Sequence, residues 1–197
     1  MSYTAYIRDP PAVIPATKET IITYIAPGLG DIYLAEQPSL LVSDGTTGLR
    51  TWEASFALAE WLLEQDLEGK KVLEFGTGTG FVSILAAKKG AKVLATDGSK
   101  MVVNRLRDNF ERNSVVAETK VLWWGKKDED LEKEWDYVLG ADVTYDVEVC
   151  ASLAASFECA IRSGGVGVLA ATVRNEETLA AFIKECGIGI SLDACSY

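Results

Sequence analysis

The chain contains no histidine, and this absence removes two kinds of chemistry at once. Without an imidazole there is no base for a Ser-His-Asp triad and no histidine ligand for a zinc ion. The cysteines show no Cys-x-x-Cys spacing, and we interpret them as small buried apolar residues: Cys150, Cys159, Cys186 and Cys195. The sequence therefore excludes zinc chemistry and histidine-dependent hydrolysis, and we expect no metal site.

Positive charge and long apolar runs are also scarce. The chain has 19 Lys and Arg against 29 Asp and Glu, a net charge of −10, which opposes binding to a phosphate backbone. No stretch reaches the roughly 20 apolar residues of a membrane span, and the first residues lack the basic start and apolar run of a signal peptide. We therefore expect a monomeric cytoplasmic protein with no membrane or nucleic-acid partner, and a protein partner with a basic target.

One segment departs from the acidic average. Residues 88–127 hold ten basic side chains against four acidic ones. Two interpretations remain open, a set of solvated helix faces and a nucleic-acid patch, and the first is favoured. The basic residues are Lys88, Lys89, Lys92, Lys100, Arg105, Arg107, Arg112, Lys120, Lys126 and Lys127.

Apolar runs alternate with amphipathic segments through most of the chain, and a length of 197 residues suits one domain. We predict strands at 71–75, 92–96, 119–123, 136–141, 166–173 and near 188–195, and helices at 79–89, 99–112, 147–162 and 175–186. This alternation predicts an α/β fold with a parallel sheet and helices on both faces.

The first fifty residues have a different character, with all five prolines and β-type runs at 20–25, 31–34 and 40–42. We interpret residues 1–50 as an extension that carries a β-hairpin, and residues 51–197 as the α/β domain. A helix with an apolar face is predicted from Glu53 to Gln65, with Thr51 as its N-cap.

A glycine motif follows the strand at 71–75. Residues 72–80 read Val-Leu-Glu-Phe-Gly-Thr-Gly-Thr-Gly, and Asp97 follows 21 residues after Gly76 behind a second strand. Glycines let the backbone approach a ligand, and an acidic residue after the next strand can accept hydrogen bonds from two ribose hydroxyls. The loop is not the Gly-x-Gly-x-x-Gly of dinucleotide sites, and Glu74 disfavours a phosphate, so a cationic nucleoside fits better. The alternative is a glycine turn in some other α/β protein.

Other candidate residues also end strands, where an open α/β sheet binds its ligand. The strand at 119–123 ends in Trp123, with Trp124 next, and one of them can offer an aromatic edge to adenine. Ala141 is small enough to leave room for the ring. The alternative for the tryptophans is that they are only the core and rim of a strand.

These motifs resemble the class I, or seven-strand, S-adenosylmethionine-dependent methyltransferases, through Glu74-Phe-Gly-Thr-Gly-Thr-Gly80 and Asp97. Residues 40–186 further resemble the methyltransferase-16 family of protein lysine methyltransferases, through Thr47-Gly-Leu-Arg-Thr-Trp-Glu53, Trp124-Gly125 and Asp142-x-x-Tyr145. No Asn-Pro-Pro-Tyr element of base or amide methyltransferases is present, which favours lysine.

The resemblance implies a Rossmann-like sheet, S-adenosylmethionine as cofactor and a protein substrate. Three segments look most like the elongation factor 2 lysine methyltransferases within the family, so elongation factor 2 is the implied substrate. The catalytic residues that face the lysine would be Asp142 and Tyr145. The residues that line the cofactor site would be Trp52, Gly76, Thr77, Gly78, Asp97, Trp124 and Ala141. The alternative for the catalytic pair is that Asp142 caps the following helix and Tyr145 only packs.

Two departures from the family pattern keep other functions open. Many relatives read Leu-Asp where this chain has Leu122-Trp123, so a carboxylate beside adenine is lost. A seven-strand sheet ends in an antiparallel pair, and the last strand is expected to be absent before Tyr197. An RNA or small-molecule methyltransferase and a non-catalytic binding module are therefore the alternatives.

Overall fold

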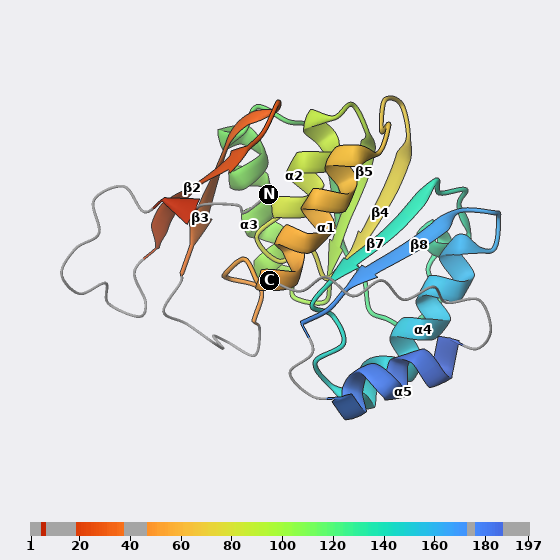
Figure 1. Cartoon of the computed structure of the whole chain (residues 1–197). Coiled ribbons are helices and arrows are strands. Elements are labelled where there is room, and N and C mark those ends of the chain that lie inside the picture. Colours follow the sequence, from red (N-terminus) through yellow and green to blue (C-terminus); the bar gives the residue numbers. More distant parts are fainter. Residues whose placement is uncertain (1–4, 7–18, 38–46, 173–175, 187–197) are drawn as a thin grey trace.

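The structure, a computed structural model, describes residues 5–6, 19–37, 47–172 and 176–186 (Figure 1). The strands predicted at 40–42 and near 188–195 lie outside these ranges.

The centre of the fold is a parallel sheet with the strand order β6-β5-β4-β7-β8. The first strand of this sheet is β4, at its centre. The chain then continues outward through β5 to β6, and crosses to the other side of β4 for β7 and β8. The strand order therefore reverses between β4 and β7, which is where such sheets bind ligands. The strands are β4 (Lys71–Phe75), β5 (Lys92–Asp97), β6 (Glu118–Val121), β7 (Tyr137–Ala141) and β8 (Val166–Ala170).

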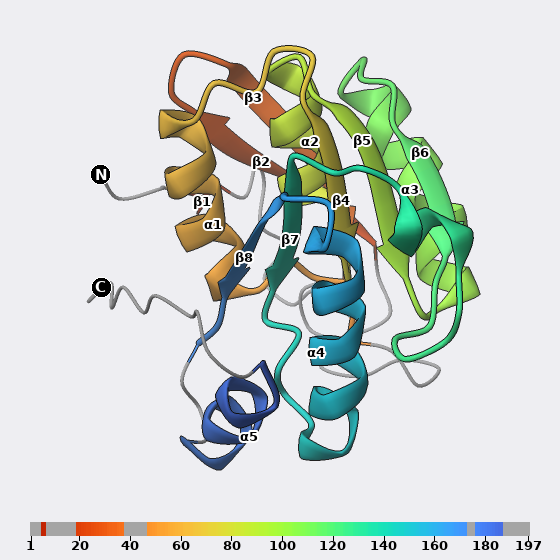
Figure 2. The same ribbon diagram turned by 90° about the vertical axis from the view of Figure 1, so that its right-hand side faces the viewer.

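Helices cover both faces of this sheet, which confirms the predicted α/β architecture (Figures 1 and 2). Alternate residues of β4 serve the two faces: Val72 packs with the cluster of α1 to α3, whereas Leu73 and Phe75 pack with that of α4. A 3-10 turn, η1 (Glu129–Glu132), precedes β7. One face carries α1 (Glu53–Glu64), α2 (Phe81–Lys88) and α3 (Lys100–Arg112), and the other carries α4 (Val147–Ile161) with α5 (Glu176–Cys186) against it.

The N-terminal region forms the predicted β-hairpin. Strands β2 (Thr20–Ala26) and β3 (Gly30–Glu36) pair antiparallel, and the short β1 (Ala5–Tyr6) pairs with β2. The hairpin lies outside α2 and α3 as an additional layer (Figure 1). Its inner side chains join the same buried cluster as α1 and α2, and these are Ile22, Tyr24, Ile32 and Leu34. The domain boundary at residue 50 stays a prediction.

The structure corrects two details of the sequence interpretation. The N-cap of α1 is Trp52, not Thr51. Strand β6 ends at Val121, so Trp123 and Trp124 follow the strand instead of belonging to it. Within the described ranges, no helix combines the length and the apolar character needed to cross a bilayer.

Candidate functional site

The glycine motif forms the loop between β4 and α2, at the carboxyl edge of the sheet. Gly76 and Gly78 have φ values of 63° and 54°, a region that side chains other than glycine enter at a cost. A Cβ on Gly76 would also stand 2.5 Å from Val143 Cγ1, and 3.6 Å from the Trp124 ring. The loop therefore requires glycine for its own conformation and for its close packing.

Three successive residues of this loop are held by hydrogen bonds, two with β5 and one with α3. The Thr77 amide donates to Thr96 O at 2.9 Å, and the Gly78 amide donates to Asp97 Oδ2 at 3.2 Å. The carbonyl of Thr79 accepts a hydrogen bond from Asn109 Nδ2 at 2.9 Å. The loop is thus fixed by the protein itself, before any ligand is considered.

Glu74, in β4, supports the glycine loop through hydrogen bonds to its side chain. The hydroxyls of Thr77 and Ser83 both donate to Glu74 Oε2, and the carboxyl is only 2% exposed. Burial raises its pKa to about 7, although these hydrogen bonds oppose the rise. Glu74 therefore keeps its proton to a higher pH than an exposed carboxyl does, so it repels an anion less than the sequence alone suggested.

Asp97 is the carboxylate that ends β5 beside the loop. Its Oδ1 accepts from the Ser99 amide at 2.8 Å and its Oδ2 from the Gly78 amide at 3.2 Å. Burial raises the pKa of Asp97 against the effect of these two bonds. A carboxylate has about four acceptor positions, so each oxygen can still accept one more hydrogen bond. The geometry suits a ligand with two neighbouring hydroxyls.

The two tryptophans after β6 lie in different surroundings. Trp124 is half-buried, and its ring lies beside the backbone of Gly76. Trp123 is 64% exposed, and its ring lies 3.9 Å from where a Cβ would stand on Gly98, next to Asp97. The alternative of a core and a rim residue of a strand is therefore wrong, because both tryptophans follow the end of β6 and Trp124 is only half-buried.

The segment before α1 crosses the glycine loop. Gly48 lies against Gly78, where an added Cβ would stand 3.5 Å from Gly48 O. Trp52 donates its indole N–H to Thr47 O at 3.0 Å, and the Arg50 guanidinium lies 4.4 Å from the centre of the Trp52 ring. The Trp52 ring is thereby fixed near the glycine loop by its own segment.

Asp142 lies where β7, β8 and α1 meet. It has a φ of 54°, uncommon for a residue with a side chain. Its carboxylate accepts from the Thr172 amide at 2.9 Å, from the Thr172 hydroxyl at 3.3 Å and, more weakly, from the Ala54 amide at 3.5 Å. The helix that follows is capped by Asp146, which accepts from the Glu148 amide, so the alternative that Asp142 caps α4 is wrong.

Tyr145 is 61% exposed and is not a core residue. Partial burial raises its pKa, and the carboxylates of Asp97 and Asp146 add to this effect. The phenol therefore keeps its proton at neutral pH and lies near enough to Asp97 to be affected by that charge. Ala141, the last residue of β7, is half-buried on the side of α1 and α2.

The structure thus brings the predicted residues to one edge of the sheet, at the carboxyl ends of β4, β5, β6 and β7 and in the segment before α1. Sequence reasoning missed the role of the residues that hold the glycine loop from outside, namely Glu36, Thr51 and Asn109. Asn109 did leave a signal, because it shares the apolar face of α3 with Val102, Leu106 and Phe110. Its buried amide needs hydrogen-bond partners.

Five of the ten basic side chains in residues 88–127 form ion pairs or hydrogen bonds with other residues of the fold. Arg105 pairs with Glu19, Arg107 with Glu111, and Lys120 with Asp128 and Asp130. Lys89 and Arg112 donate to backbone or side-chain oxygens of neighbouring residues. These contacts support solvated helix faces over a nucleic-acid patch. In the ranges that the structure describes, no group of His, Cys, Asp and Glu is arranged to hold a metal ion.

Comparison with known sequences gives a consistent result. A family model described as lysine methyltransferase matches residues 40–187. The protein-lysine N-methyltransferase EFM3 of Chaetomium thermophilum is 42% identical over 173 residues, which is 79% of this chain and 52% of that protein. The human protein-lysine N-methyltransferase EEF2KMT is 30% identical over 191 residues, 84% of this chain and 57% of that protein. The chain spans about half the length of the curated relatives it matches.

Solved structures share the fold. A Pyrococcus abyssi tRNA (uracil-54, C5)-methyltransferase in complex with S-adenosyl-L-homocysteine superposes with a TM-score of 0.57 at 23% identity, over 85% of this chain and 38% of that one. The magnesium protoporphyrin IX methyltransferase of Synechocystis with bound SAM superposes with a TM-score of 0.54 at 19% identity, over 71% of this chain and 70% of that one. At these identities the likeness concerns the fold alone.

Proposed function

Because the chain belongs to the lysine methyltransferase family, we propose that it transfers a methyl group from S-adenosylmethionine to a lysine side chain of a protein. The observation that carries the proposal is the meeting of two groups at one edge of the sheet. One is the glycine loop with Asp97, and the other is Asp142 with the exposed Tyr145.

The first group fits a nucleoside cofactor. Asp97 has one acceptor position left on each oxygen, as two ribose hydroxyls require. Gly76 and Gly78 present backbone without a side chain, and the hydroxyl of Thr77 between them is directed to Glu74. Trp124 and Ala141 would face the adenine, and Trp52 would close the site from the segment before α1. S-adenosylmethionine, when bound here, supplies a methyl group on a positively charged sulfur.

The second group suits a lysine acceptor. The incoming ammonium must lose a proton before its nitrogen can attack, so the residues around it have to hold the cation and then orient the neutral amine. The carboxylate of Asp142 attracts the ammonium, and its bonds to Thr172 keep its orientation fixed. The protonated phenol of Tyr145 lines the approach with its ring and its hydroxyl. Alignment of donor and acceptor in this way can supply roughly 7 to 11 kcal/mol.

We further propose elongation factor 2 as the protein substrate, in the cytoplasm, with the enzyme acting as a monomer. Support comes from the human relative named EEF2KMT, which aligns with 84% of this chain. A mouse relative named EEF1A lysine methyltransferase 3 aligns with 49% of it at 38% identity, so elongation factor 1A is the substrate to test beside it. The net charge of −10 suits a basic target on either protein.

The test is methyl transfer from labelled S-adenosylmethionine to purified elongation factor 2, to elongation factor 1A and to a cell lysate with and without nuclease. The expected result is a labelled protein band from elongation factor 2, with a methylated lysine found by mass spectrometry. Label that disappears with nuclease would indicate an RNA substrate. A folded protein that binds the cofactor but transfers no methyl group to any of these would indicate a binding module.

A further inference from the structure

We propose that the N-terminal hairpin β2–β3 positions the glycine loop through two hydrogen-bond routes that converge on Thr79. Thr51 and Asn109 are the positioning residues of these routes. The inference rests on the proposed function in one respect, namely that the loop they hold is the one that binds S-adenosylmethionine. The coupling of hairpin and loop stands on the geometry alone.

The first route begins at Glu36, the last residue of β3. Its carboxyl is 2% exposed and accepts from the Tyr24 hydroxyl at 2.9 Å. It also accepts from the amide and the hydroxyl of Thr51, at 3.0 and 2.6 Å. A buried carboxyl with three donors is a strongly constrained group, because the loss of any donor leaves an unsatisfied acceptor. Glu36 thereby joins both hairpin strands to the segment that leads into α1.

Thr51 carries this route on to the glycine loop. Its hydroxyl lies 2.7 Å from the hydroxyl of Thr79, and both residues are buried. A hydroxyl has one hydrogen, and Thr51 gives its hydrogen to Glu36. Thr79 must therefore be the donor to Thr51. The route has a fixed direction, from Thr79 through Thr51 to the carboxylate of Glu36.

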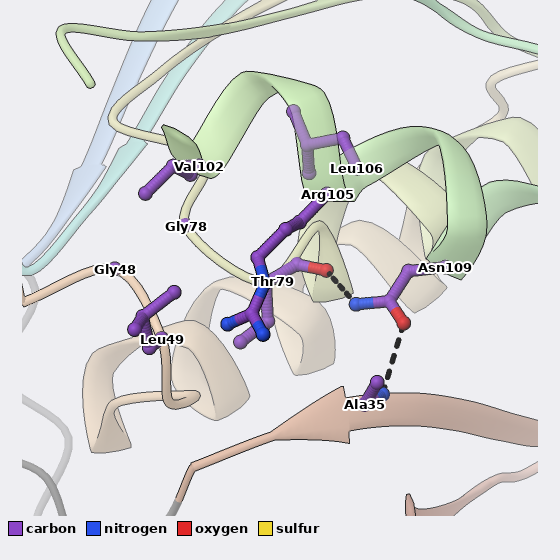
Figure 3. A pocket seen from close by; sticks show the side chains of 9 residues that line it. All are labelled: Ala35, Gly48, Leu49, Gly78, Thr79, Val102, Arg105, Leu106 and Asn109. Atoms are coloured by element: carbon purple, nitrogen blue, oxygen red, sulfur yellow. Dashed lines mark hydrogen bonds between the residues drawn. The ribbon is translucent and has the colours of Figure 1, made fainter. Parts of the chain in front are cut away.

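The second route is a single side chain, the amide of Asn109 on α3 (Figure 3). Its Nδ2 donates to Thr79 O at 2.9 Å, and its Oδ1 accepts from the Ala35 amide of β3 at 2.9 Å. Its Oδ1 also accepts from Arg112 Nη1 at 2.8 Å. Asn109 is 3% exposed, so its bonds to Thr79 and Ala35 are shielded from water. One amide thus joins the free edge of the hairpin to the glycine loop.

The two routes hold different atoms of Thr79, the hydroxyl and the carbonyl. Packing leaves the loop little room, since the cavity between Gly48, Gly78, Thr79 and Asn109 measures about 10 Å³. The next residue back, Gly78, donates its amide to Asp97. A shift of Thr79 would therefore move the amide that orients the Asp97 carboxylate.

Asn113 provides a matched control on the same helix. It lies one turn after Asn109, is also buried, and holds the same strand, because its Oδ1 accepts from the Tyr33 amide at 2.8 Å and its Nδ2 donates to Tyr33 O at 2.7 Å. Its other bond goes to Asn109 O and not to the glycine loop. Truncation of Asn113 weakens the attachment of the hairpin without touching Thr79.

The experiment compares Asn109→Ala with Asn113→Ala, and Thr51→Val with Thr51→Ser, in the full chain without cofactor. Hydrogen exchange of the Gly78 and Gly80 amides is measured under conditions where thermal melts show all variants folded. Asn109→Ala and Thr51→Val are expected to speed this exchange by about fivefold, the effect of one or two lost hydrogen bonds. Asn113→Ala and Thr51→Ser should stay within about twofold, since they keep the contacts to Thr79.

The same four variants are then titrated with S-adenosylhomocysteine by calorimetry. The expected pattern repeats, with a Kd about fivefold weaker in Asn109→Ala and Thr51→Val only. Equal effects of Asn109→Ala and Asn113→Ala, or no faster exchange in Thr51→Val, would overturn the coupling. If the wild-type protein does not bind S-adenosylhomocysteine, the proposed function fails, whereas the exchange data still decide the coupling. If Asn109→Ala does not fold, the two Thr51 variants decide it alone.

Discussion

The two halves of the candidate site are built in opposite ways. On the glycine-loop side, Glu74, Thr77 and Thr79 are at most 6% exposed, and each hydrogen-bonds to another element, namely α2, β5 and the segment before α1. On the side after β7, Tyr145 is 61% and Val147 is 49% exposed. The first half is completed by the chain itself, whereas the second leaves apolar surface for something else to cover.

This difference fits the two ligands of the proposed reaction. A cofactor is the same molecule in every turnover, so a loop fixed in advance lowers the ordering cost of binding it. A protein substrate brings its own surface, and exposed aromatic residues gain their burial only when it docks. Substitutions in the first half should therefore change stability and cofactor affinity, and substitutions in the second half should change methyl transfer.

The largest expected effect concerns the buried half and its response to pH. The folded protein should lose stability as the pH rises from about 4.5 to about 7, because burial raises the pKa of Glu74 from 4.5 to about 7. Below 4.5 the group is protonated in both states, and above 7 its ionisation costs the folded state about 3 kcal/mol. Burial also raises the pKa of Glu36 and Asp97, which adds to the same trend.

Glu74→Gln isolates this contribution. The amide oxygen can still accept from Thr77 and Ser83, since both hydroxyls donate to a single oxygen of Glu74. Unfolding with denaturant at pH 5 and pH 7.5 should show a smaller stability difference in the variant than in the wild type. The same difference in both proteins would mean that Glu74 does not titrate in this range.

The next effect concerns Asp97, the carboxylate that belongs to the glycine-loop half. Asp97→Ala should weaken S-adenosylmethionine binding by about 1.5 to 3 kcal/mol, through the loss of two charge-assisted hydrogen bonds to the ribose. Calorimetry gives the affinity directly. Asp97→Asn is the control for shape, because it keeps the size of the side chain. Unchanged affinity in both variants would remove Asp97 from the site.

A smaller effect separates binding from chemistry. Tyr145→Phe and Asp142→Asn should reduce methyl transfer by about tenfold or more, while the cofactor affinity stays within a few-fold. Tyr145→Phe is the cleaner of the two, because the exposed hydroxyl contributes little to the fold, whereas Asp142 also holds Thr172. Equal losses of cofactor affinity and transfer would assign these residues to the fold instead of the lysine.

The sequence predicted the sheet, its helices and the meeting of the glycine loop with Asp97, because these follow from local patterns. Parallel strands that are neighbours end at the same edge, so residues that end them lie close together. Trp123 was predicted as the last residue of a strand, but β6 ends two residues earlier, at Val121. Its exposure follows from this position after the strand. Thr51 was wrong as an N-cap because its hydroxyl is taken by Glu36, 15 residues earlier in the chain.

Such contacts depend on how the hairpin docks, and no spacing rule encodes that. Asn109 shows the same limit, since the polar residue on an apolar face was visible, but its partners Ala35 and Thr79 were not. Local sequence patterns predict the glycine-loop half of the site, because motifs define it. What they miss are the long-range hydrogen bonds that hold this half in place.

The smallest effect tests whether the tryptophans divide between the two halves. Trp124 lies half-buried beside Gly76, so Trp124→Ala should weaken cofactor binding several-fold, by about 1 kcal/mol for a lost ring contact, with transfer recovering at saturating S-adenosylmethionine. Trp123 is 64% exposed, and its ring lies beside Gly98, next to Asp97. If it serves the cofactor, Trp123→Ala should raise the KM for S-adenosylmethionine. If it serves the protein substrate, only the KM for that substrate should rise. The exposure of the ring favours the second result. A rise in the cofactor KM alone would assign Trp123 to the glycine-loop half of the site.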